Sequence, residues 1–295
     1  AAGGGAYACQ YNRMCGGGAD SRGRPTESSN YDGTLTLSGF ESRRLGWARR
    51  QGIVPTTDRR DVRLAPLYGT SEVALIPLGA GSAGDTLSLE YRRRANGFDA
   101  FPPQETDNPF YGRIYRDLPA EGLLVTLSHG EPTGPPGRYL YDFVPPSNRL
   151  VRAGSRCDGT SDGCAGPYAP WRDDMLRPDG ISQITPWTRP NVSGYTHYPA
   201  GVEPNWFAVT DVRQVDDQLA FDVIADVRRS AFTITADSWM GVETDGVVFR
   251  EPVRVANGAT LRVGEGATVS FSGGLAVEPG AQFVCEPSAT CRGVE

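Results

Sequence analysis

The chain has 295 residues, 39% of them hydrophobic, with 37 Gly and 23 Pro, which predicts two or three packed units built from short strands rather than long helices. All 29 basic residues are Arg and 35 residues are acidic, so the net charge is -6 and no basic stripe points to nucleic-acid binding. No apolar run approaches the ~18 residues that would cross a membrane, so no membrane span is expected.

A tight turn is the first predicted element, and it carries Tyr11, Met14 and Gly16. Met14 taken alone could be ordinary core filler. The chain begins AAGGGAY, with no initiator Met, charged segment or apolar run typical of a signal peptide. We therefore expect a longer polypeptide to precede it.

A short helix is predicted next. Ser38 and Glu41 fit a capping box that starts the helix, and Leu45 and Trp47 stand at its end. Phe40 and Trp47 would lie on its buried stripe. The first unit is expected to cover residues 1–51.

Short runs of β-forming residues, bounded by Pro, Gly and Asp, continue through residues 52–230 and predict a β-sandwich. The clearest run alternates Leu219, Phe221 and Val223 with smaller or polar residues, so one of its faces is buried. The expected strands are Val62–Leu67, Glu72–Pro77, Thr86–Arg92, Gly122–Ser128, Arg138–Val144, Asn205–Val212 and Gln218–Val227.

An acidic loop lies between Cys157 and Cys164. Its carboxylates, Asp158 and Asp162, could take Ca²⁺, but the loop lacks the spacing of an EF-hand and two carboxylates are few for calcium. A stapled solvent loop is the competing interpretation.

Residues 231–295 repeat a turn sequence, with Gly-Ala-Thr at Gly258 and Gly266 and Gly-Ala-Gln at Gly280. An alternating strand follows each turn. This recurrence predicts a short β-solenoid-like tail, either free-standing or docked on the sandwich.

The cysteines fall into three close pairs, which favours three local disulfides over zinc because the spacing matches no zinc ribbon or finger. Disulfides indicate an oxidising compartment, so the protein is expected to be secreted. The last of these bridges would cap the open edge of the tail. The pairs are Cys9 with Cys15, Cys157 with Cys164, and Cys285 with Cys291.

Four segments, of which the first runs from Tyr7 to Trp47, resemble in this order one family: the zinc endopeptidases of the metzincin group, of the gametolysin and immune-inhibitor-A type. Tyr11, Met14 and Gly16 resemble its Met-turn, which passes beneath the catalytic zinc. Leu45, Gly46 and Trp47 resemble the end of the helix that follows it.

Two strand segments and the stretch DGISQITPWTRPNVSGY with QLAFDVI extend the resemblance to about residue 228. The first segment resembles the family's Glu-x-Arg-x-x-x-Gly-Phe-Asp element, and the second resembles its Pro-x-x-Gly-Leu-Leu element. The matching residues are Glu90, Arg92, Gly97, Phe98 and Asp99 in the first, and Pro119, Gly122, Leu123, Leu124 and Val125 in the second, with Ser128 and His129 near the family's histidine.

The resemblance implies the C-terminal portion of a secreted zinc metalloendopeptidase. The family's His-Glu-x-x-His zinc motif is absent from these 295 residues, so no catalytic residue is assigned and the chain alone is expected to be inactive. Zinc would belong to the full-length protein, bound by an upstream domain of the same polypeptide. Its substrate would be a protein or glycoprotein.

Two other functions are compatible with the residues. A β-sandwich adhesion module could recognise carbohydrate or a surface protein, with stacking platforms at Trp171, Trp187, Trp206 or Trp239 where these are exposed, although a tryptophan buried in the core is the commoner case. A free-standing hydrolase ranks last, because the two histidines lie far apart in sequence and no nucleophile motif is present.

Overall fold

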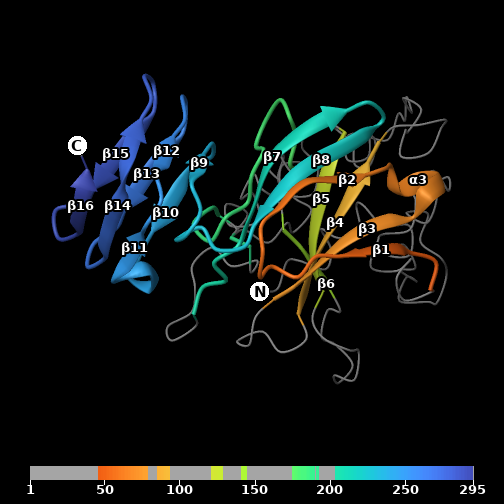
Figure 1. Cartoon of the computed structure of the whole chain (residues 1–295), viewed down its shortest axis with the longest axis horizontal. Helices are drawn as coiled ribbons and strands as arrows, with labels where there is room; N and C mark the ends of the chain where they lie inside the picture. The colour runs from red at the N-terminus through yellow and green to blue at the C-terminus, as the bar shows by residue number, and fades with distance from the viewer. Residues whose placement is uncertain are drawn as a thin grey trace, which may run out of the picture.

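The structure, a computed structural model, describes residues 46–78, 85–93, 121–128, 141–144, 175–189, 191–192 and 203–294, and this part is mainly β (Figure 1). Trp47, expected on the buried stripe of a helix, lies in no helix and is 63% exposed, so that expectation was wrong. Gly46 has a φ of 75°, a left-handed conformation that turns the chain toward the first strand. No helix among the described residues is long and apolar enough to cross a membrane.

Among the described residues, one sheet has five strands in the order β1-β3-β4-β5-β6. β1 runs parallel to β3, and the other neighbours are antiparallel. The three central strands have the bounds predicted from the sequence, and the one-turn helix α3 (Leu67–Thr70) precedes β3. The strands are β1 (Arg49–Gly52), β3 (Glu72–Pro77), β4 (Thr86–Arg92), β5 (Gly122–Ser128) and β6 (Tyr141–Phe143).

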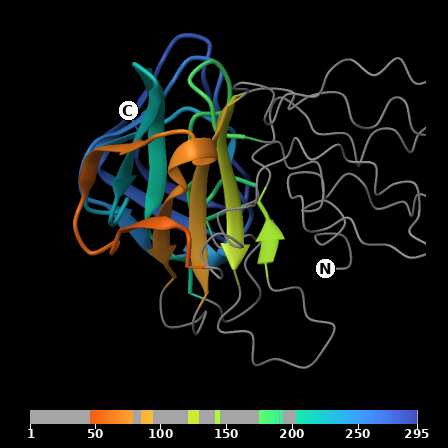
Figure 2. The same cartoon turned by 90° about the vertical axis from the view of Figure 1, so that its right-hand side faces the viewer.

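A second, antiparallel sheet has the order β2-β8-β7 in the described part, with β2 (Arg59–Leu64), β7 (Ala208–Val215) and β8 (Gln218–Ile224). Leu64, Leu89 and Phe221, which come from both sheets, belong to one hydrophobic core. Burial of this shared core holds the two sheets together. Figure 2 shows the two sheets toward the viewer and the C-terminal strands behind them.

The strands from β9 onward, in the continuous stretch 203–294, form the predicted solenoid-like coil. All of their pairings are parallel. Val247 pairs with Val269 on the next coil, and Val269 pairs with Cys291 on the coil after that, a step of 22 residues each time. The strands are β9 (Phe232–Ile234), β10 (Ser238–Met240), β11 (Val247–Phe249), β12 (Val253–Val255), β13 (Thr260–Val263), β14 (Thr268–Val277), β15 (Gln282–Cys285) and β16 (Thr290–Val294).

The repeated Gly-Ala sequence forms the corners of the coil. Gly258 and Gly266 have φ values of 84° and 76°, and the N-H of the following Ala donates to the carbonyl three residues earlier. A positive φ at the third residue of a four-residue turn is the type II geometry, which favours Gly. Ala259 and Ala267 follow these glycines, point inward and are 2% and 1% exposed. The Gly-Ala sequence therefore recurs because each corner needs a Gly for its turn and has room inside for a small side chain.

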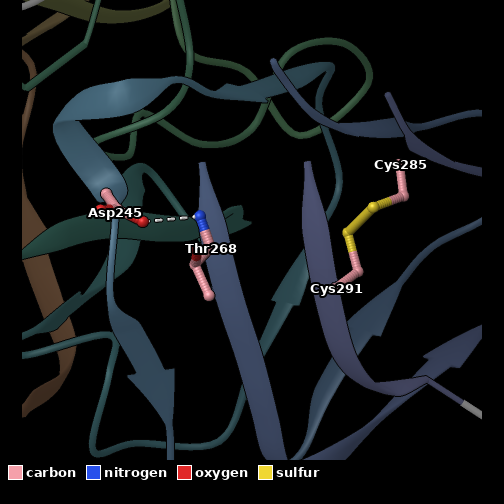
Figure 3. The surroundings of a disulfide bond; sticks show 4 residues. All are labelled: Asp245, Thr268, Cys285 and Cys291. Atoms are coloured by element: carbon pink, nitrogen blue, oxygen red, sulfur yellow. Dashed lines mark hydrogen bonds between the residues drawn. A yellow bond between two sulfur atoms is a disulfide. The ribbon is translucent and has the colours of Figure 1, made fainter. Parts of the chain in front are cut away.

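The first coil lacks this turn and uses acidic side chains instead. Asp237 Oδ1 accepts a hydrogen bond from the Thr260 N-H at 2.9 Å. Asp245 Oδ1 accepts one from the Thr268 N-H, also at 2.9 Å (Figure 3). Each carboxylate therefore joins the first coil to a corner of the second.

An aromatic stack fills the interior of the coil. The Phe249 and Phe271 rings lie 5.2 Å apart and nearly parallel, and the edge of Trp187 meets Phe249 at 5.3 Å. Trp187 precedes the coil in sequence, and the same core includes Ala208 and Ile224 of the second sheet. The coil is therefore docked on the second sheet.

The Cys285–Cys291 disulfide is present, as predicted (Figure 3). Cys285 pairs with Val263 and Cys291 with Val269, and both valines are fully buried in the preceding coil. The two cysteines thus occupy the inward positions of the last coil, where no further coil covers them within the described residues.

Replacing both cysteines, Cys285→Ser and Cys291→Ser, is expected to lower the free energy of unfolding by about 2 kcal/mol, because the bridge closes a loop of only a few residues. Thermal and urea unfolding would measure the change. Arg292→Ser, an exposed position on β16, is the matched control and should change stability by less than about 0.5 kcal/mol. Equal stability of the double variant and the control would show that the bridge does not hold the last coil.

Candidate functional site

Most of the predicted site residues lie outside the described part of the chain. They are Tyr11, Met14, Gly16, Cys9, Cys15, Cys157, Cys164, Asp158, Asp162 and Trp171. Within the described ranges, no group of three or more His, Cys, Asp or Glu side chains could hold a metal ion. Of the described residues of the family resemblance, Glu90, Arg92 and Gly122 meet in the first sheet, whereas the QLAFDVI segment forms β8 of the second sheet.

Glu90 and Arg92 form a buried ion pair on β4. The Nε and Nη2 atoms of Arg92 lie 2.8 and 2.7 Å from Glu90 Oε1, and the two side chains are at most 1% exposed. The alternation of the strand places Leu89 and Tyr91 in the core between the sheets and the ion pair on the opposite face. Because desolvating two charges is costly, each of these side chains depends on the other.

The start of β5 lies beside this pair, since Arg92 is the register partner of Gly122. A Cβ at Gly122 would come within 2.8 Å of Arg177 Cγ and of Met175 Cβ, so only Gly allows this approach. Arg177 is itself buried, and its Nε donates to Asp179 Oδ1 at 2.8 Å. In this cluster Arg92 pairs with Glu90 and Arg177 pairs with Asp179. Such paired charges suit a structural role better than proton transfer.

Three Asp-Val-Arg tripeptides, which the sequence analysis did not single out, each contain an ion pair between the Asp and the Arg. The repetition of the tripeptide is the signal that could have identified them. They are Asp61-Val62-Arg63, Asp211-Val212-Arg213 and Asp226-Val227-Arg228, with N···O distances of 2.7, 2.8 and 2.8 Å.

Two of these tripeptides form one charged network across the second sheet. Asp61 and Asp211 have φ values of 55° and 54° where the strand registers shift, which is the geometry of β-bulges. Arg213 reaches Asp61 Oδ1 at 3.0 Å and Asp222 Oδ1 at 3.2 Å, and Arg60 lies 2.8 Å from Asp222 Oδ2. The network holds both bulges against β8.

The pKa of Asp222 gives this network a testable pH dependence. Burial alone would raise that pKa, but hydrogen bonds from Arg60, the Asp61 N-H and Arg213 outweigh burial and lower it. A carboxyl with a depressed folded-state pKa adds stability above its unfolded pKa of about 3.9 and loses it as pH falls through the folded value.

We therefore expect the stability difference between the parent chain and Asp222→Asn to be largest near neutral pH and to shrink as the pH falls from about 5 to 3. Urea unfolding at each pH would measure it. A difference that stays constant over this range would contradict a stabilising role for the ionised carboxylate.

The tryptophans do not offer bare stacking platforms. Trp187 is 1% exposed and packs in the core of the coil, so its expected role as a platform was wrong. Trp206 and Trp239 are partly exposed, and each has a guanidinium carbon 4.4 Å from its ring centroid, from Arg228 and Arg189 respectively. Both indoles therefore present an Arg-covered surface.

Two groups of described residues bear on function: the buried cluster around Glu90 and Arg92, and the group around Trp239. The cluster joins two segments of the family resemblance, whereas the group at Trp239 is formed by the coil and the segment before it. No protein-family model, curated protein or solved structure matches this chain.

Proposed function

We propose that this chain is the C-terminal portion of a secreted zinc metalloendopeptidase of the gametolysin and immune-inhibitor-A type, and that it is not catalytic by itself. Residues 1–51 would end the catalytic domain, and residues 52–230 would be a β-sandwich formed by the two sheets. Residues 231–295 extend this support as the coil. The zinc, its histidines and the catalytic glutamate would come from the preceding part of the polypeptide.

The observation that carries the proposal is the meeting of two motif segments in paired strands. The Glu-x-Arg motif ends β4, the Gly-Leu-Leu motif starts β5, and Arg92 and Gly122 are register partners. Residues that define the resemblance in sequence are thus also in contact in the fold. A motif that contains a buried ion pair and a glycine required by close packing suits a scaffold element.

The edge strand β1 offers a place for the catalytic domain to pack. Among the described residues, β1 is the outer strand of its sheet and its four residues are exposed, with Trp47 63% and Val54 56% exposed on either side of it. Exposed large apolar side chains that lie close together are typical of an interaction surface. The exposed Trp47 is itself one of the residues that resemble the end of the catalytic domain.

The proposal predicts that the purified 295-residue chain binds no stoichiometric zinc and cleaves no protein, whereas the longer polypeptide does both. Elemental analysis and a casein-type cleavage assay on the two proteins would test this. In addition, the coding sequence upstream should contain His-Glu-x-x-His within one domain length. One zinc per chain in the 295-residue protein, or an upstream region without that motif, would refute the proposal.

A further inference from the structure

The corner of the coil between β12 and β13 carries the dipeptide Asn257-Gly258. The two other Gly-Ala corners have Glu265 and Pro279 in the place of Asn257. Asn257 is exposed, and Gly258 has a φ of 84° at the third position of the turn. An Asn followed by Gly is prone to lose its side-chain ammonia, because Gly has no side chain to hinder attack by its backbone nitrogen on the carboxamide.

Asn257 and Gly258 also join the second coil to the third. The Gly258 N-H donates to the Gly280 carbonyl at 3.2 Å, and the Asn257 N-H donates to Glu278 Oε2 at 3.1 Å. The Asn257 carboxamide lies over Gly280, where an added Cβ would be 2.3 Å from its Oδ1. The nitrogen that would attack the carboxamide is therefore engaged whenever the third coil is in place.

The third coil has the fewest buried residues of the stack. β15 and β16 lie at the end of the coil, and the residues of β15 are exposed or half-buried (Figure 1). By contrast, Leu261 and Val263 of β13 are both 0% exposed. Local opening of a protein concentrates where buried apolar contacts are few. The third coil should therefore open from the second before the rest of the coil unfolds, and each opening frees the Gly258 nitrogen.

We propose that Asn257 is a site of spontaneous deamidation and that opening of the third coil sets the rate of the reaction. In the open state, base removes the proton from the Gly258 nitrogen, which then bonds to Asn257 Cγ. The carboxamide nitrogen takes up a proton and leaves as ammonia, so a succinimide remains. Water opens the succinimide at either carbonyl and gives aspartate or isoaspartate. The reaction consumes water, releases ammonia and needs no enzyme, metal or oxidant.

Either product weakens the contact between the second and third coils. An aspartate at position 257 would place a carboxylate close to Glu278, and like charges facing each other across adjacent strands are destabilising. Isoaspartate adds a methylene group to the backbone, which moves the Gly258 N-H away from the Gly280 carbonyl. The deamidated chain is therefore expected to have a more open third coil. This inference does not depend on the peptidase proposal.

Incubation of the purified 295-residue chain at mildly acidic and mildly alkaline pH, followed by peptide mass spectrometry, would test the site. Aspartate and isoaspartate are expected in the tryptic peptide of residues 255–262, and they should form faster at alkaline pH because the Gly258 nitrogen must lose a proton. Measuring this peptide separately distinguishes Asn257 from Asn96-Gly97, the other Asn-Gly pair of the sequence. The matched control Asn257→Gln should react at least tenfold more slowly, because its longer side chain cyclises less readily.

The double variant Cys285→Ser and Cys291→Ser tests the coupling to the third coil, since it removes the bridge within that coil. It should deamidate at least threefold faster than the parent chain, whereas Arg292→Ser should change the rate less than twofold. Unchanged hydrogen exchange of the β11 amides would show that the rest of the coil stays folded in the double variant. Faster exchange of the β15 amides is expected in the parent chain after deamidation.

Three outcomes would overturn the proposal. The first is equal rates in the double variant and the parent chain. The second is a parent chain that reacts as fast as a synthetic peptide of residues 255–262, because the third coil would then offer no protection. The third is no product in either folded protein under conditions that convert the peptide completely. None of these readouts depends on zinc or proteolysis by the chain.

Discussion

Replacing Glu90 by Ala is expected to lower the free energy of unfolding by about 3–5 kcal/mol. The substitution removes the carboxylate that lies 2.7 Å from the Arg92 guanidinium, which is only 1% exposed. Removing one member of a buried ion pair typically costs this much, because the remaining charge stays desolvated. Urea unfolding, monitored by tryptophan fluorescence and circular dichroism, would measure the loss.

The ion pair between Arg254 and Glu278 on the coil is the matched control. Its side chains are 62% and 35% exposed and its N···O distance is 3.4 Å, so Glu278→Ala should cost less than about 1 kcal/mol. Replacing Glu90 and Arg92 together with Leu should recover part of the loss, since neither charge of this pair then remains buried. Equal losses for Glu90→Ala and Glu278→Ala would contradict the assignment of Glu90 as a buried support of the first sheet.

Phe249→Ala is expected to cost about 3–5 kcal/mol as well. Phe249 is fully buried, and its ring centroid lies 5.2 Å from that of Phe271. The ring centroids of Trp187 and Phe232 lie 5.3 and 6.3 Å from it. Truncating a buried Phe removes its apolar contacts and leaves a cavity that its rigid neighbours cannot fill. Since the stack joins the coil to Trp187, the variant should also loosen the contact between the coil and the second sheet.

Val248→Ala provides the control for that prediction. Val248 is the neighbouring residue on β11, faces outward and is 42% exposed, so its truncation should change stability by less than about 0.5 kcal/mol. Hydrogen exchange of the β10 and β13 amides would report the loosening. A Phe249→Ala variant as stable as Val248→Ala would mean that the aromatic stack does not stabilise the coil.

The strands with clear alternation and clear turn residues were predictable from the sequence. β3, β4 and β5 match their predicted bounds, because each is a run of β-forming residues between Gly, Pro or Asp. The Gly-Ala repeat likewise predicted the second and third coils, since the turn at each corner requires a Gly and has room only for an inward Ala.

Other strand ends depend on tertiary contacts that a local pattern does not contain. β8 ends at Ile224, short of the predicted Val227, because the Ala225 N-H donates to Asp58 Oδ1 instead of continuing the ladder. β2 starts at Arg59, ahead of the prediction, because the bulge at Asp61 breaks the alternation.

The first coil lies within the predicted solenoid-like tail of residues 231–295, but its individual strands were not predicted, for a related reason. It lacks the Gly-Ala turn, and the carboxylates of Asp237 and Asp245 bind the corners of the second coil in its place. The burial of Trp187 could not be decided from the sequence, because an isolated Trp gives no sign of whether it will be buried. Its role in closing the interior of the coil depends on residues that come together only in the folded chain.

The central claim, that this chain supports a zinc peptidase, is tested most directly on the native protein, captured from its source with an antibody against the described β region and assayed for zinc and proteolysis. The proposal predicts a polypeptide longer than 295 residues that carries one zinc per chain and whose protease activity is abolished by a chelator and restored by zinc. A captured protein without zinc, or one whose proteolysis is unaffected by the chelator, would contradict it.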